Sequence, residues 1–248
     1  MKFLLIFVLV FSYMYAKDTQ KVTLGIGPYV QSQPYYGVKN IVVPSPVIFF
    51  DNGLIYVRWS RAGIYFLGEK GDEISWGFSL TAQPRPFGYK PTDSTALKGM
   101  EERKSTVEGG LAFSASYQKD TYIEVMLLTD LLSRHDSWLL RTEIGDTYKA
   151  GDFTFYPSVV LMYESQHFLN YYYGVKQTES TATRKAYTTS SGLEIGIQTY
   201  ISYPLTKNVS ILTNLRYDHI ATTAKHSPIV KDSYIYSGLF SLMYSFEY

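Results

Sequence analysis

The chain has 248 residues, with 23 basic residues against 22 acidic ones and no cysteine. The near-neutral charge gives no electrostatic footprint for nucleic acid, and the lack of cysteine excludes disulfides, thiolate chemistry and a four-cysteine zinc site. Aromatic residues make up 17% of the chain, a surplus that suits the two interfacial girdles of a membrane-spanning β-barrel.

The first 16 residues have the pattern of a cleaved secretory signal. Lys2 supplies a positive charge, residues 3–11 (FLLIFVLVF) form an apolar stretch, and a short segment ends at Ala16. This apolar stretch is far shorter than the ~20 residues that a membrane-spanning helix needs. We therefore expect residues 1–16 to be removed and residues 17–248 to form one mature domain.

From residue 20 onwards, apolar and polar residues alternate with the two-residue period of a β-strand, and we find no comparable 3.6-residue period. Turn signals such as Asp51-Asn52-Gly53 divide the chain into about twelve strands, with ten as the alternative. The pattern predicts an all-β fold, a single antiparallel transmembrane β-barrel. The expected strands are 20–30, 41–50, 54–67, 73–82, 106–117, 121–131, 137–144, 153–164, 167–173, 191–203, 208–219 and 235–248.

The last expected strand, 235–248, has one face made almost wholly of apolar and aromatic residues. In a soluble protein such a face requires a covering helix or sheet, whereas in a barrel lipid covers it. We expect this strand to close the barrel and so to remove the exposed edges of the sheet.

Four connections are long, namely 31–40, 83–105, 174–190 and 220–234. If both termini are periplasmic, strand parity puts three of them outside the cell and 83–105 on the periplasmic side, where turns are normally short. Either the strand count is off by one before residue 106, or 83–105 is a periplasmic or lumen-inserted feature.

Charged residues fall on the strand faces opposite the apolar ones, where we expect the lumen. An arginine or lysine that faced lipid near the midplane would cost roughly 2–4 kcal/mol. Two interpretations compete: an ion-pair network that crosses and plugs the lumen, or the lining of a cation-preferring channel. The predicted lumen-lining residues are Arg58, Glu108, Glu124, Arg141, Glu143, Glu164, Glu194 and Arg216.

No residue pattern points to catalysis or to a metal. The four histidines lack metal-ligand spacing, and His135-Asp136-Ser137 places three triad residue types next to one another, which suits a polar turn rather than a triad. We expect no enzymatic activity, no cofactor and no metal site.

A series of short motifs runs along nearly the whole mature chain. In order, these are Gly25-Ile26-Gly27, Pro34-Tyr35-Tyr36-Gly37, Pro44, Asp93-Ser94, Leu97-Lys98-Gly99-Met100, Arg103, Glu108-Gly109-Gly110, Tyr171-Tyr172-Tyr173-Gly174-Val175, Ser227-Pro228-Ile229-Val230 and Tyr244-Ser245-Phe246. Each is weak alone, but their order and spacing resemble those of the MipA/OmpV family of outer-membrane proteins. The resemblance implies a barrel in the outer membrane of a Gram-negative bacterium, surrounded by outer-membrane lipid.

The resemblance also implies a role. The role behind the family name is a scaffold that holds a lytic transglycosylase and a murein synthase together, and other members are porin-like or adhesive. We therefore consider a scaffold first, then a porin-like channel for small solutes, then a surface adhesin or receptor. The Ser/Thr-rich loop 177–191 motivates the adhesin, although a solvated, mobile loop explains it more simply. The predicted partner-binding segment comprises Asp93, Ser94, Leu97, Gly99, Met100 and Arg103.

Overall fold

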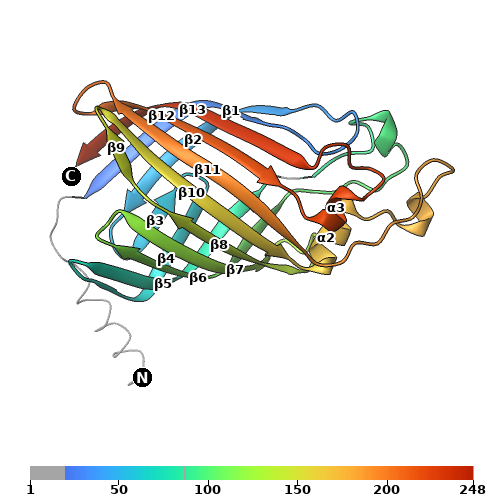
Figure 1. The fold of residues 1–248 in the computed structure, drawn as a ribbon, viewed down its shortest axis with the longest axis horizontal. Helices are drawn as coiled ribbons and strands as arrows, with labels where there is room; N and C mark the ends of the chain where they lie inside the picture. Colours follow the sequence, from blue (N-terminus) through green and yellow to red (C-terminus); the bar gives the residue numbers. More distant parts are fainter. Residues whose placement is uncertain (1–19, 87, 248) are drawn as a thin grey trace, which may run out of the picture.

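The computed structural model describes residues 20–86 and 88–247 (Figure 1). The expected signal, residues 1–16, and the final residue Tyr248 lie outside the described residues. The described chain forms one antiparallel sheet that closes on itself, because the first strand pairs with the last. The short β9 and its predecessor β8 both pair with β10 and form one interrupted strand. The closed wall therefore has twelve strands, and the predicted all-β barrel is confirmed.

Each strand pairs with its neighbours in chain order around the barrel. The strands are β1 (Lys21–Gln31), β2 (Ile41–Asp51), β3 (Ile55–Arg58), β4 (Arg61–Lys70), β5 (Ile74–Arg85), β6 (Thr106–Tyr117), β7 (Thr121–Asp130), β8 (Trp138–Gly145), β9 (Tyr148–Ala150), β10 (Phe153–Glu164), β11 (Gly192–Pro204), β12 (Val209–His219) and β13 (Tyr234–Glu247). The short helices are η1 (Thr95–Leu97), α2 (Gln166–Tyr173), η2 (Gln177–Glu179) and α3 (Thr222–Lys225), and none of the described helices is long and apolar enough to cross a membrane.

The predicted strand 54–67 is wrong in one respect, because the chain reverses inside it. Arg58 pairs with Arg61 across a two-residue turn, which makes β3 and β4 a hairpin. Trp59 occupies this turn with a φ of 57°. Tight hairpin turns need positive φ and usually take Asn or Gly there, so a tryptophan gives no sequence signal for the turn.

The predicted strand 167–173 is also wrong, because these residues form the helix α2. Its buried residues are Phe168, Leu169, Tyr172 and Tyr173. This spacing follows one face of a helix with 3.6 residues per turn, a period that the run of aromatic residues obscures. The missed hairpin adds a strand and the helix removes one, so the two errors cancel in the count of twelve.

The two faces of the wall differ as the two-residue period predicts. On β13, Tyr236, Phe240, Leu242 and Tyr244 are each 53–56% exposed, whereas the alternate Leu239 is 2% exposed. The exposed face is apolar, and lipid rather than water is the solvent that stabilises it. The same alternation therefore defines an outer, lipid-facing side and an inner, lumen-facing side for each strand.

The two ends of the barrel are built differently. Tight turns join the strands at the end where the described chain begins and ends, whereas α2, α3 and the long connections gather at the opposite end (Figure 1). Outer-membrane barrels have short periplasmic turns and longer extracellular loops, which makes the looped end extracellular. Because β3 and β4 are separate strands, parity now puts 83–105 at this end as well, so of the two alternatives the first holds: the strand count before residue 106 was off by one.

Candidate functional site

The interior of the barrel holds a network of buried charges centred on Glu124 of β7. Its side chain is 5% exposed and accepts hydrogen bonds from Arg61 of β4 and from Arg58 Nη1 of β3, the latter at 3.3 Å. Arg141 Nη1 of β8 lies 3.7 Å from the same carboxylate. Since β5 and β6 separate the β3–β4 hairpin from β7 in the wall, the bonds from Arg58 and Arg61 cross the lumen.

Arg141 extends this network along the wall, from β7 to the adjacent β8. It donates to Glu143, two residues along β8 and on the same inner face. Glu143 accepts three further hydrogen bonds, from Tyr122 Oη at 2.6 Å, Ser158 Oγ at 2.9 Å and Gln198 Nε2 at 2.8 Å. These donors satisfy the carboxylate from β7, β10 and β11, as a buried charge requires.

A second ion pair lies nearer the extracellular end. Arg85 of β5 donates to Glu108 of β6 through both Nε and Nη2, the latter at 3.2 Å, and Gln83 Nε2 donates to the same carboxylate at 3.2 Å. The side chain of Glu108 is completely buried. The Arg85 guanidinium carbon also lies 4.8 Å from the ring centroid of Phe168, so this ion pair contacts the helix α2 at the extracellular end.

The remaining predicted charges lie on β10, β11 and β12. Arg216 Nε donates to Asp218 Oδ2 at 2.8 Å, and Glu164 and Glu194 are 2% and 6% exposed. The structure thus places all eight predicted residues on the inner side. It buries six of them and leaves the side chains of Arg58 and Arg216 34% and 20% exposed.

Three charged residues of the interior were not among the predicted lumen-lining residues. Asp218 follows Arg216 by two residues, and Arg85 follows Gln83 by two, so the strand period that identified the other charges could have found them. Arg61 was assigned to the same strand as Arg58, three residues away, which put the two side chains on opposite faces. The hairpin turn between them brings both guanidinium groups to Glu124.

Apolar side chains fill another part of the lumen. Val47, Leu212, Leu239 and Met243 form a buried cluster with exposed fractions of at most 7%. Trp59, at the tip of the β3–β4 hairpin, packs against this cluster. The centroid of its ring lies 6.4 Å from that of Tyr200 of β11. Ion pairs and apolar contacts therefore fill these parts of the barrel interior.

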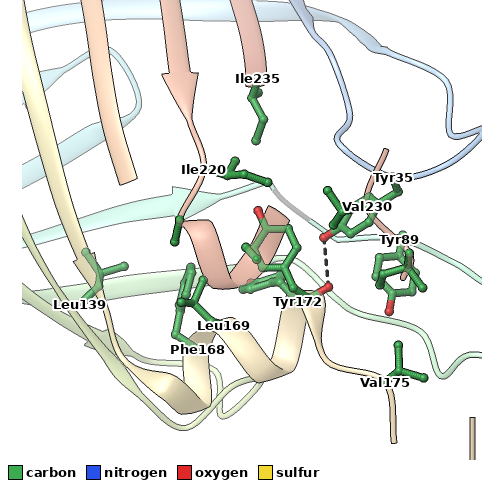
Figure 2. Close-up of a cluster of buried hydrophobic side chains, with 14 of the residues drawn as sticks. Tyr35, Tyr89, Leu139, Phe168, Leu169, Tyr172, Val175, Ile220, Val230 and Ile235 are labelled. Carbon is green, nitrogen blue, oxygen red and sulfur yellow. Dashed lines mark hydrogen bonds between the residues drawn. The ribbon is translucent and has the colours of Figure 1, made fainter. Parts of the chain in front are cut away.

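The extracellular mouth is covered by a cap with its own apolar core (Figure 2). Phe168 and Leu169 of α2 pack with lumen-facing Leu139, and all three are at most 2% exposed. Tyr35, from the β1–β2 loop, donates a hydrogen bond to the Tyr172 carbonyl at 3.3 Å. Segments from four separate connections thus form one packed layer over the lumen.

The connections 86–105 and 174–190 are fastened to each other within this cap. Arg103 Nη2 donates to both oxygens of Glu179 at 2.8 and 3.0 Å, and the pair is almost wholly buried. The buried Arg184 donates to the carbonyls of Ala96, Lys98 and Glu179. The interpretation of 177–191 as a mobile loop therefore fails for its buried residues Glu179, Arg184 and Thr189.

These contacts also set the ionisation state of the Glu179 carboxyl group. Burial alone would raise the pKa of Glu179, but the N–H groups of Glu101 and Lys176 and the Arg103 guanidinium lower it below its ordinary value. The carboxylate therefore stays ionised at neutral pH and holds the two connections together.

The predicted partner-binding segment lies in this cap. Leu97, Met100 and Arg103 are buried, where they support the cap from within. Asp93 and Gly99 are exposed, and Ser94 is half-buried. Its buried residues are engaged in packing within the cap. That the segment binds a partner stays a prediction.

His135, which lies against the cap, is expected to make the free energy of unfolding depend on pH. Burial against Phe168 and Tyr172 lowers the pKa of His135 below its ordinary value of 6.5, and Arg85 acts in the same direction, while Asp130, Glu108 and Asp136 oppose it. The unfolded chain therefore binds a proton at a higher pH than the folded chain, so acid favours unfolding.

We expect the free energy of unfolding to fall as the pH drops below about 6.5, the unfolded histidine value. His135→Leu should flatten this part of the profile, as measured by urea unfolding in lipid vesicles. The exposed His226 provides a control, because His226→Leu should leave the profile unchanged. Parallel wild-type and His135→Leu profiles would contradict the assignment.

No group of three or more potential metal-binding side chains gathers anywhere in residues 20–86 and 88–247.

Comparison with known proteins places this barrel in a family. The family described as "MltA-interacting protein MipA" matches residues 24–246. The MltA-interacting protein of Escherichia coli (strain K12) is 26% identical, covering 92% of this chain and 90% of that protein. The putative outer membrane protein YiaT of the same strain is 22% identical over 88% of each chain. Outer membrane protein OmpV of Vibrio cholerae is 28% identical over 66% of this chain and 63% of its own length.

Among solved structures, the translocator domain of the autotransporter NalP from Neisseria meningitidis aligns with a TM-score of 0.42 and 10% identity, covering 97% of this chain and 94% of that one. The family match spans almost the whole described barrel, and the relatives are named as outer membrane proteins. The chain therefore belongs to the MipA family, and it is a β-barrel of the Gram-negative outer membrane.

Proposed function

We propose that this protein is a closed outer-membrane barrel that holds a lytic transglycosylase, a murein-cleaving enzyme, at the inner face of the outer membrane. The family description and one relative's name supply the partner class, since both read "MltA-interacting protein". A murein synthase is the second partner in this proposal, as the family resemblance implies. The barrel itself performs no chemistry in this role.

The observation that carries the proposal is the filled interior. A passive porin needs a continuous aqueous path, but here Arg58 and Arg61 reach across the lumen to Glu124. The cap adds a second closed layer above them. A barrel without a path acts through its rims, and the porin-like alternative is therefore the weaker one.

The orientation of the barrel in the membrane decides which rim would contact the murein enzyme. A murein enzyme lies in the periplasm, so it would meet the short turns rather than the cap that contains Asp93 and Gly99. The turn between β4 and β5 offers exposed Asp72 and Glu73 on that rim. The cap contains a matched acidic pair at the opposite end, Glu101 and Glu102, which is also exposed.

These two pairs give a controlled experiment. Purified barrel immobilised in lipid nanodiscs is tested for retention of a purified lytic transglycosylase. We expect the wild type and the double variant Glu101→Lys/Glu102→Lys to retain the enzyme, and Asp72→Lys/Glu73→Lys to retain less of it. No retention by the wild type, or loss only in the cap variant, would contradict the proposal.

A further inference from the structure

The barrel wall is incomplete on one side, because the β3–β4 hairpin is shorter than its neighbours. β2 pairs with β3 only from Phe49 to Asp51, and β4 pairs with β5 only as far as Ala82. The stretches 41–47 of β2 and 83–84 of β5 have no strand partner on the edges that face each other, among the described pairings. We call this interruption the seam. Figure 1 shows the hairpin ending partway along the barrel, short of the capped end.

The backbone direction at the seam follows from two hydrogen bonds. The Ile48 carbonyl accepts from Trp59 N at 2.8 Å, so even-numbered residues of β2 point their backbone groups towards β3. The Ile74 carbonyl accepts from Gly71 N at 3.1 Å, so even-numbered residues of β5 point towards β4. Above the hairpin, the same groups point into the seam.

Prolines occupy these positions on both sides of the seam. β2 carries Pro44-Ser45-Pro46, and β5 carries Pro84 next to its last residue, Arg85. The three prolines within the strands, Pro44, Pro46 and Pro84, have even numbers and are exposed, so each places a nitrogen without a hydrogen towards the seam. On the unpaired stretch of β2, Val42 alone retains a seam-facing N–H group.

This arrangement lowers the cost of exposing an open edge to hydrocarbon. An unpaired backbone N–H in lipid costs several kcal/mol, which is why barrels normally close completely. The outward side chains beside the seam are apolar, with Ile26 at 64% and Leu80 at 57% exposed, so the seam lies within the lipid-facing belt. Proline also prevents another strand from pairing there. The sequence thus keeps the edge open within the membrane.

An exposed, inward-facing side chain beside the seam marks space on its inner side, which we call the recess. Val43 faces inwards, opposite Tyr29 and in phase with the fully buried Val47, yet it is 43% exposed. Trp59 forms the floor: its ring lies 5.6 Å from that of Tyr29, and its Nε1 donates to Ser45 Oγ at 3.0 Å. The recess is therefore aromatic below and aliphatic at the side. Two missing strands separate the backbones of β2 and β5 by three inter-strand spacings, about 14 Å in all.

We propose that the seam is a lateral opening through which the acyl chain of an outer-leaflet lipid enters the recess and packs against Trp59 and Tyr29. The barrel then has a lipid-binding site in its wall, separate from the periplasmic rim. The filled lumen below Trp59 stops the chain from passing further, so the site binds lipid rather than conducting it. This proposal does not depend on the enzyme-binding role.

Tryptophan fluorescence can test this directly, since the chain contains only three tryptophans. The variant Trp76→Phe/Trp138→Phe retains Trp59 alone, and Trp59→Phe/Trp76→Phe retains the lipid-exposed Trp138 as a reference. Each is reconstituted into phosphatidylcholine vesicles with or without bromine on the acyl chains, because bromine quenches indole emission at short range. We expect Trp59 to lose emission to an extent comparable to Trp138. No quenching of Trp59 by brominated chains would overturn the proposal.

A second substitution separates entry into the recess from general closeness to lipid. Val43→Phe in the Trp59-only protein narrows the recess and should reduce quenching. Val30→Phe is the matched control, because Val30 lies on the lipid-facing side of the adjacent β1 and is 41% exposed. It should leave quenching unchanged. Equal quenching in the two variants, with both folded, would show that no chain enters the recess.

Discussion

Replacing Glu124 with alanine is expected to reduce the free energy of unfolding by about 3–5 kcal/mol, the usual cost of breaking a buried ion pair by removing one partner. Glu124 neutralises Arg58, Arg61 and Arg141, and its loss leaves three guanidinium groups inside the barrel without this carboxylate. Arg141 keeps Glu143, but Arg61 has no other salt bridge among the described residues. Urea unfolding of the protein in lipid vesicles measures the effect.

The control for this prediction is Glu69→Ala, since Glu69 is exposed on β4. A surface carboxylate far from such a network changes stability by no more than about 0.5 kcal/mol. If the Glu124 and Glu69 variants unfold at the same urea concentration, the cross-lumen contacts do not stabilise the barrel.

Glu179→Ala is expected to release the cap. The substitution removes the acceptor for Arg103 and for the N–H groups of Glu101 and Lys176, all at 2.8–3.0 Å. Breaking a buried ion pair by removing one partner costs about 3–5 kcal/mol. A cost of this size raises the population of the detached loop at least ~100-fold. The loop contains Arg184, which trypsin can cleave only when the loop opens. We expect the variant to be cut there far faster than the wild type.

Thr183→Ala is the matched control, because Thr183 is exposed in the same loop. Its cleavage rate should stay close to that of the wild type. Rapid cleavage of the wild type at Arg184 would instead show that the loop is mobile and that the contacts to Ala96 and Lys98 do not hold it.

The sequence predicted the wall of the barrel because the strand period repeats with little interruption. The lipid-facing side of β13 follows from its alternating residues, whereas the count of twelve was reached because the missed hairpin and the helix α2 offset each other. The hairpin at Trp59 escaped detection because its turn lacks glycine and asparagine, and positive φ at a tryptophan is enforced by packing rather than by local preference. The helix α2 escaped because aromatic residues suit both strands and helices until their partners are known.

The inner charges were predictable as a set, but their pairing was not. Periodicity puts Glu108 and Glu124 on the inner face, yet it cannot say that one meets Arg85 of the adjacent strand and the other meets Arg61 across the lumen. Such contacts depend on the register and the turns, which place residues far apart in sequence beside each other. The cap is harder still, because Arg103 and Glu179 belong to connections without any period.

The network explains why a polar barrel interior does not imply a channel. Each buried carboxylate of the central group is satisfied by arginines or neutral donors, and the apolar cluster around Val47 and Leu239 fills another part of the lumen. Charges that pair across a narrow barrel stabilise its closed form, whereas charges that line an open one need water to solvate them.

The central claim, that the lumen is closed by its own side chains, is tested most directly by recording current through planar lipid bilayers that contain the purified protein. The structure predicts no steady conductance above the bare membrane at any salt concentration at which the protein stays folded. A reproducible, stepwise conductance of the wild type would contradict it.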